Sequence, residues 1–524
     1  MSTQHQNFPA ARQRTFGVEL EIVVPWLWED EPDPHEATAS QLPPILRLPV
    51  SLKAAYDSTI IEENDKVINF VYNAFTNTLI SHGLPAENLY GSSDAGSSLD
   101  STTTEDYTKW CIKGDDTVSE FGGGYKWYGM EIVSPAEVAS DKAFQLIRYA
   151  LNVLKSNFRI TVNRTCGFHV HVGDGPELMP LDHVRRVAGL FWAADPLLAL
   201  LHPPNRRTAY YSQSIRERSN LAHGMTASQK DKHEFDLACC NVYIGGRVRH
   251  GEAPVSWREK YHEKNHLITY GKTRQKGHFE PFFMKDPHDK TEVKNDGTLP
   301  LPSYCILNDA NSEIDVQVEK YAAGKGSWDA IPNTPYESTR ERKTRRRLAY
   351  PRYSPDEFTN IGFTDLEYKA SKDIGVWAGI REIFSCSTSC VIEWLLRAGD
   401  RPNYSLAVYS CFGLDKRGTR PGTIEFREAA GTVDGLWAET WARICVGLTN
   451  FAIHAPVEKY LAVLSNIDRA ADEGGDEGAA YDVLDLLDQV GLSAEAELVE
   501  KRLLENEKEW GLTYIAPSTK SGKR

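Results

Sequence analysis

The chain has 524 residues and a formal net charge of −14, with 41% hydrophobic and 25% charged residues. This composition is typical of a folded globular protein and excludes a chain that is disordered throughout. The acidic balance argues against a broad surface for phosphate backbones, so no nucleic-acid partner is expected. The longest apolar stretch, 190–201, is interrupted by Asp195 and Pro196 and is too short to span a membrane, so no membrane partner is expected either.

The cysteines and the first residues predict the compartment. Nine cysteines are scattered along the chain and form no disulfide framework that spacing would indicate. The first residues have neither the apolar core nor the small-residue cleavage site of a secretory signal. We therefore expect a cytoplasmic protein.

The apolar periodicity predicts an α+β fold. Residues 1–14 form a polar tail that we expect to be disordered, and residues 15–201 form the first part of the main domain. The elements expected in that part are a strand at 16–24, a proline-rich connection at 25–49, a helix at 64–82, a flexible loop at 91–106, strands at 107–112 and 125–133, a helix at 141–158 capped by Ser140, a strand at 159–172 and a helix at 182–201.

The second half begins with a long polar stretch. Residues 202–371 are weakly periodic and predict an insertion or a subdomain, in which the basic run 338–347 is expected to be a solvated loop. Residues 372–455 form the second part of the main domain, and 456–524 a helical extension. The elements expected there are a helix at 377–396, strands at 404–411 and 423–427, a helix at 435–454 and helices within 457–510.

Two predicted strands each place a pair of ionisable side chains on one face. Glu19 and Glu21 stand two residues apart in FGVELEIVV, and His169 and His171 do so in CGFHVHVG. Since strand side chains alternate, the members of each pair point the same way. Two like charges in an apolar strand are costly unless a cation or a shared proton offsets them. The alternative is an ordinary ion pair beside a solvated carboxylate.

Two further strands carry carboxylates. Glu131 interrupts the apolar segment GMEIVSP, and Glu425 and Arg427 share a face in PGTIEFREAAGTVD. Each would be an ordinary ion pair by itself. Together the four strands offer four carboxylates and two imidazoles, and such oxygen-rich sets favour Mg²⁺ or Mn²⁺ over zinc.

These motifs, in this order, resemble the amidoligase family of the carboxylate–amine ligase superfamily, which includes glutamine synthetase and glutamate–cysteine ligase. The resemblance rests on FGVELE, WCIKGDD, GMEIVSP, CGFHVHVG, PPNRRTAYY and GTIEFREAAGTVD, and covers about 16–207 and 423–441. It implies an antiparallel sheet of the glutamine synthetase type with helices on one face, in which 15–201 and 372–455 form one catalytic domain. The implied reaction joins a small-molecule or peptide carboxylate to an amine through an acyl phosphate, with ATP and Mg²⁺ or Mn²⁺ as cofactors.

The resemblance also implies a set of metal ligands. Glu19, His169 and Glu425 would hold one ion, and Glu21 and Glu131 would hold a second.

Further residues are assigned to the substrates. The resemblance places His171 near the nucleotide phosphates and Arg427 at the transferred phosphate or the substrate carboxylate, while Arg206 and Arg207 offer planar donors for phosphate or carboxylate. The residues expected to take part in catalysis are Arg427, Glu131 and Asp116. The alternatives to Asp116 as ammonium ligand or base are Asp115 and Glu120, and the run Gly122–Gly124 either contacts nucleotide or forms a plain turn.

Two other functions stay open from the residues alone. A metal-dependent hydrolase would use the imidazoles and carboxylates to activate water without a nucleotide. A binding protein would keep the sheet without turnover, although like charges clustered on apolar strands argue against a degenerate site.

Overall fold

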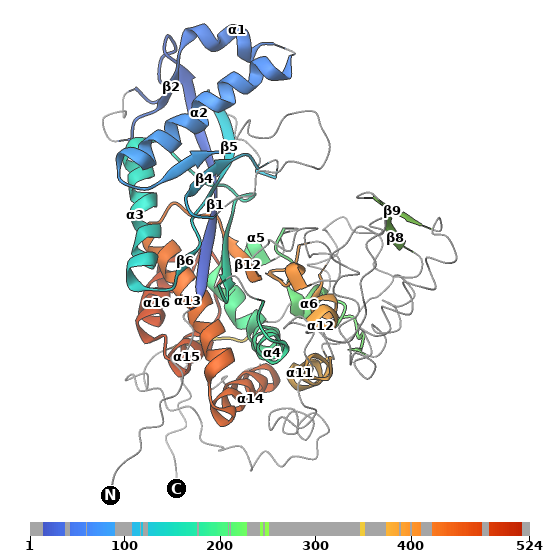
Figure 1. Cartoon of the computed structure of the whole chain (residues 1–524). Helices are drawn as coiled ribbons and strands as arrows, with labels where there is room; N and C mark the ends of the chain where they lie inside the picture. Colours follow the sequence, from blue (N-terminus) through green and yellow to red (C-terminus); the bar gives the residue numbers. More distant parts are fainter. Residues whose placement is uncertain are drawn as a thin grey trace, which may run out of the picture. The chain divides into compact units, whose positions relative to one another are not determined.

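Figure 1 shows the computed structural model of the chain. It describes residues 14–36, 42–89, 107–227, 241–250, 346–351, 374–409, 422–473 and 481–515, except for short gaps at 59, 116, 119–123, 176–177, 208, 210, 245–246, 387–388 and 399–400. None of the helices in these ranges has the length and apolar character that a membrane crossing requires. The chain divides into two compact units, one made of 1–178, 421–423 and 431–442, the other of 179–420, 424–430 and 443–524.

The first unit is built around a mostly antiparallel sheet with the long strand β1 (Thr15–Trp28) at its centre. β1 pairs antiparallel with β5, β6 and β7 and parallel with β2, and β4 pairs antiparallel with β5 and parallel with β3. These strands are β2 (Leu46–Leu48), β3 (Ala86–Asn88), β4 (Trp110–Lys113), β5 (Lys126–Val133), β6 (Glu137–Val138) and β7 (Gly167–Gly173).

Helices cover the apolar face of this sheet. On the first half of β1 the even-numbered side chains are buried, and the Phe16 ring stacks on Phe144 of α3 (Asp141–Asn157) at 4.5 Å. α2 (Ile61–Ser81) packs against β3, β4 and α3, and Phe75 stacks on Phe158 at 4.1 Å. Ser140 accepts a hydrogen bond from the Ala143 N–H, which confirms the predicted cap of α3. A short helix, α1 (Lys53–Tyr56), precedes α2.

Two strand predictions in this unit are wrong in their bounds. β1 continues through Pro25 to Trp28 because Trp26 and Trp28 are buried among aromatic rings, with Trp26 stacked on Tyr128 at 5.7 Å. The strand predicted at 159–172 begins only at Gly167. Before it, Thr161 forms an isolated bridge with Val23, and Asn163 makes the local turn bonds to Thr165.

The second unit is mainly helical. α4 (Leu181–Leu198) contacts α11 (Val376–Ser385), α12 (Ser389–Leu396) and α14 (Val457–Glu473), and Figure 1 shows α11 and α14 beside it. The remaining elements are α5 (Pro204–Arg207), α6 (Ile215–Arg218), β8 (Asn241–Ile244), β9 (Arg247–His250), β10 (Arg347–Leu348), β11 (Tyr404–Ser405), β12 (Thr423–Ala430), α13 (Gly435–His454), α15 (Val483–Gln489), α16 (Ser493–Asn506) and β13 (Tyr514–Ile515).

Most predicted helices of the second half are found, with corrections. The helix at 435–454 is confirmed, whereas the one predicted at 377–396 is two helices separated after Ser385. The strand predicted at 404–411 is limited to Tyr404–Ser405, because a 3₁₀ turn follows at 407–409. The mixed α+β class is confirmed.

Some described residues of the predicted insertion are packed inside the second unit. Ser219 and Leu221 are fully buried in the second unit. The last two arginines of the basic run form ion pairs: Arg346 with Glu507 at 2.8 Å and Arg347 with Asp485 at 3.1 Å. The prediction of a solvated loop is therefore wrong for Arg347, which begins β10, whereas the Arg346 side chain is 50% exposed and 338–345 lie outside the described residues.

Candidate active site

Strand register gathers the charged side chains of the first unit on one face. Glu21 lies directly opposite Glu131 on β5, and Glu19 lies directly opposite His169 on β7. Residues opposite each other in a ladder project to the same side, and His171 follows His169 by two. We call this set, Glu19, Glu21, Glu131, His169 and His171, the acidic face. The strand register therefore brings these five residues together on one face of the sheet, as the sequence predicts.

Both imidazoles contact Glu19. His169 Nδ1 lies 3.0 Å from Glu19 Oε2, and His171 Nε2 lies 3.1 Å from Glu19 Oε1. Burial opposes ionisation of Glu19, but the charge of His171 and hydrogen bonds from both histidines hold the pKa of this carboxyl well below its usual range. Glu19 is therefore an anion at neutral pH, and its side chain is 20% exposed.

The Glu21 carboxylate contacts two residues of β7. The Gly167 N–H donates to Glu21 Oε2 at 2.5 Å, and His169 Nε2 lies 3.4 Å from Glu21 Oε1. His169 thus bridges the two carboxylates of β1. Only 4% of Glu21 is exposed, so the Gly167 N–H takes the place of water at Oε2.

Glu131 faces a lysine that the sequence analysis did not single out. Lys113 on β4 lies directly opposite Glu131, and Lys113 Nζ is 3.3 Å from Glu131 Oε1. Burial, and next the charge of Glu19, raise the pKa of Glu131 well above its usual range, while Lys113 acts in the other direction. Lys113 belongs to the motif WCIKGDD, but its place opposite Glu131 depends on a register that the sequence does not display.

Strand β12 starts in the first unit. Thr423 Oγ1 lies 3.3 Å from His171 Nδ1. Because side chains alternate, Glu425 and Arg427 share a face of β12 with Thr423. The contact between Thr423 and His171 is a second feature that sequence reasoning missed.

Within the second unit, Arg427 is firmly positioned. Its guanidinium pairs closely with Glu425, and its Nε donates to the Tyr211 carbonyl at 3.4 Å. Its backbone N–H donates to the Asn403 carbonyl at 2.8 Å, and its own carbonyl accepts from Arg206 Nη2 at 2.9 Å. Four groups therefore fix one residue of β12.

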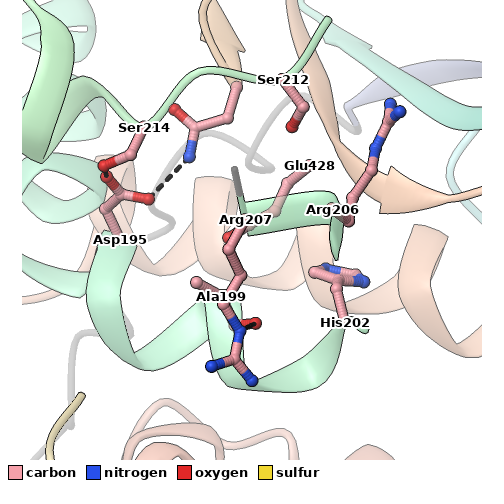
Figure 2. A pocket seen from close by; sticks show the side chains of 9 residues that line it. Asp195, Ala199, His202, Arg206, Arg207, Ser212, Ser214 and Glu428 are labelled. Carbon is pink, nitrogen blue, oxygen red and sulfur yellow. Dashed lines mark hydrogen bonds between the residues drawn. The ribbon is translucent and has the colours of Figure 1, made fainter. Parts of the chain in front are cut away.

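Arg206 and Arg207 lie on α5, where Figure 2 shows their side chains pointing to different sides. Arg206 is 2% exposed and bonds the Arg427 backbone, while Arg207 Nε donates to the Ala199 carbonyl at 2.9 Å. A contact of either arginine with a nucleotide stays a prediction.

These arginines line a small polar pocket inside the second unit, with a cavity volume of about 10 Å³ (Figure 2). Asp195 of α4 lines this pocket and accepts three hydrogen bonds. Ser214 Oγ and the Arg216 N–H donate to Oδ2, and Asn403 Nδ2 donates to Oδ1 at 2.6 Å. Burial raises the pKa of Asp195. The lining residues are Asp195, Ala199, His202, Arg206, Arg207, Ser212, Ser214, Asn403 and Glu428.

Glu428 is the second acid of this pocket. It receives a short hydrogen bond from the Tyr404 hydroxyl on Oε2, and among the described residues no partner hydrogen-bonds to its buried Oε1. Burial, followed by the charge of Asp195, raises the pKa of Glu428 well above its usual range. Burial also lowers the pKa of His202 well below its usual range, helped by Arg502.

The predicted base region is only partly described. Asp116, Glu120, Gly122 and Gly123 lie outside the described residues. Asp115 accepts hydrogen bonds from the backbone N–H and the hydroxyl of Thr117, at 2.7 and 2.6 Å. Asp115 therefore holds a local turn.

Comparison with known proteins gives one family match. Residues 12–264, just under half of the chain, match the family model described as "putative amidoligase enzyme". This part of the chain is therefore similar to the amidoligase family. No curated protein and no solved structure gives a significant match to the chain. The amidoligase match includes the whole acidic face and ends before Glu425 and Arg427.

The donor atoms of the acidic face suit a divalent cation. Mg²⁺ holds oxygen and nitrogen ligands at about 2.1 Å in an octahedron, so neighbouring ligand atoms lie about 3 Å apart. Around Glu19, carboxylate and imidazole atoms are 3.0 and 3.1 Å apart. The sequence expectation of carboxylate and histidine ligands therefore fits the residues present.

Proposed function

We propose that this protein joins a carboxylate to an amine through an acyl phosphate, using ATP and Mg²⁺ or Mn²⁺. The observation that carries the proposal is the acidic face, where Glu19 is kept ionised between two imidazoles on apolar strands. Such a cluster costs stability in the absence of a cation, and residues arranged at that cost are typical of functional sites.

The cation would neutralise the phosphate oxygens of ATP, which is the main requirement of phosphoryl transfer. Glu19 and His169 would hold it, with Glu425 as a further ligand from the strand that begins beside His171 at Thr423. His171 would then lie at the phosphates. Glu21 and Glu131, which the resemblance assigns to a second ion, lie beside this set on the acidic face.

The reaction has two balanced steps. An oxygen of the substrate carboxylate forms a bond to the γ-phosphorus while the bond between that phosphorus and the ADP oxygen breaks. The amine nitrogen then bonds to the acyl carbon, inorganic phosphate leaves, and the amine gives up a proton. The planar guanidinium of Arg427 suits the transferred phosphoryl group or the substrate carboxylate, and Arg206 and Arg207 are assigned to nucleotide phosphate.

The proton acceptor and the setting complete the proposal. Asp116 is assigned as the base, since Asp115 already accepts two hydrogen bonds from Thr117. The substrates are small-molecule or peptide acids and amines in the cytoplasm, with no nucleic acid or membrane involved.

Hydroxylamine tests the proposal without knowledge of the natural amine, because it converts acyl phosphates to hydroxamates. The full chain is incubated with ATP, Mg²⁺, hydroxylamine and pools of carboxylic acids. We expect hydroxamate and ADP in equal amounts, and a loss of at least about 100-fold in Glu19→Gln, since even residues behind a metal ligand are worth about 10- to 100-fold. Glu63→Gln, on the exposed side of α2, is the matched control and should retain activity.

Two outcomes would contradict the proposal. Hydrolysis of amide substrates that needs metal but ignores ATP would indicate the hydrolase instead. Hydroxamate formation that is unchanged in Glu19→Gln would show that the acidic face is not the site.

A further inference from the structure

Three charged side chains form a row across three neighbouring strands of the first unit. Glu21 on β1 lies directly opposite Glu131 on β5, and Glu131 lies directly opposite Lys113 on β4. All three therefore project from the same face of the sheet. Lys113 ends the row, with Nζ 3.3 Å from Glu131 Oε1.

Each carboxylate of this row already has protein partners. Glu21 Oε2 accepts a hydrogen bond from the Gly167 N–H of β7 at 2.5 Å, and Glu21 Oε1 lies 3.4 Å from His169 Nε2. Glu131 has the Lys113 ammonium group. A metal ion at Glu21 and Glu131 would have to replace these contacts and would lie beside a fixed positive charge.

The other end of the acidic face differs. Glu19 has no lysine or arginine among its ion-pair partners in the described part of the first unit, and its partners there are the two histidines. Neutral imidazole is itself a metal ligand, so a cation entering at Glu19 gains ligands from the two histidines of the first unit.

We infer that Lys113 takes the place of a second metal ion at Glu21 and Glu131, so that the acidic face binds one divalent cation, at Glu19 and the histidines. The inference rests on the proposed metal-dependent function and deepens it by fixing the number of ions. Glu21 is then a positioning residue that holds the start of β7, and through it the imidazole of His169.

Counting bound Mn²⁺ tests this without any enzyme activity. Free Mn²⁺ is measured by electron paramagnetic resonance as the full-length chain is titrated with the metal alone. We expect one Mn²⁺ per wild-type chain and a second in Lys113→Met, which keeps the aliphatic stem but removes the charge. Lys109→Met removes a nearby lysine that pairs with Glu87 instead, and should bind one ion like the wild type.

Further variants separate the inference from the proposed function. Glu19→Gln should lose the single ion, while Glu21→Gln should keep it with at most about a tenfold loss of affinity, as expected of a residue behind a ligand. Two ions in the wild type, or one in both Lys113→Met and a folded Lys113→Gln, would overturn the inference and leave the proposed function standing. A wild-type chain that binds no Mn²⁺ would contradict both.

Discussion

Glu19 in the first unit and Asp195 in the second are carboxylates on apolar elements, yet different groups surround them. Glu19 is 20% exposed and contacts two imidazoles, groups that can change their charge and bind metals. Asp195 is 1% exposed and receives hydrogen bonds from a hydroxyl, an amide and a backbone N–H. Burial of an acid therefore does not by itself identify a reactive site, whereas the chemistry of its partners does.

Glu131 in the first unit and Glu428 in the second also differ in the groups that contact them. Burial raises the pKa of both Glu131 and Glu428. The Lys113 ammonium group forms an ion pair with Glu131, whereas the neutral Tyr404 hydroxyl donates a hydrogen bond to Glu428. We therefore expect substitutions in the pocket of the second unit to change stability, and those on the acidic face to change metal and nucleotide binding.

Asp195→Ala should give the largest loss of stability. It leaves the side chains of Ser214 and Asn403 and the Arg216 N–H without their acceptor in a buried place, and such loss of a buried charged partner costs about 3–5 kcal/mol. Urea unfolding followed by circular dichroism measures it, with Asp182→Ala, at the start of the same helix, as control. A loss below about 1 kcal/mol would show that the network around Asp195 is not structural.

Glu428→Gln should change how stability depends on pH. The unfolded chain releases the Glu428 proton near pH 4.5, and the folded chain only well above it. Between these values the native state binds one more proton, so wild-type stability falls as pH rises, by about 1.4 kcal/mol per unit. The variant lacks this dependence, and its stability relative to the wild type should rise from pH 5 to pH 8.

Urea unfolding at pH 5, 6, 7 and 8 checks this result, with Glu458→Gln on α14 as a control for the loss of one exposed carboxylate. Parallel profiles for Glu428→Gln and the wild type would show that the buried acid ionises as readily in the folded chain as in the unfolded one.

The acidic face was largely predictable because its signal is local. Alternation within a strand is enough to put Glu19 beside Glu21 and His169 beside His171. The helices at 141–158 and 435–454 were predictable for a similar reason, since apolar periodicity and the Ser140 cap are written in neighbouring residues.

What the sequence hid depends on contacts between distant segments. Lys113 acquires its place only through the register of β4 on β5, and Thr423 meets a histidine 252 positions earlier. Asp195 was visible as an acid interrupting an apolar stretch, but its partner Ser214 caps the short helix α6 and its partner Asn403 lies in a bend before β11. Turn and register geometry of this kind leaves no pattern in a single sequence.

The central claim is that the acidic face binds metal and ATP together, and thermal unfolding of wild type and Glu19→Gln tests it most directly. A ligand that binds only the folded state stabilises it by about 2.7 kcal/mol at one hundred times its dissociation constant. We predict that Mg²⁺ or Mn²⁺ alone raises the Tm of the wild type, that ATP raises it further only when the metal is present, and that Glu19→Gln abolishes both rises. An equal rise in both proteins, or no rise in the wild type, would contradict the claim.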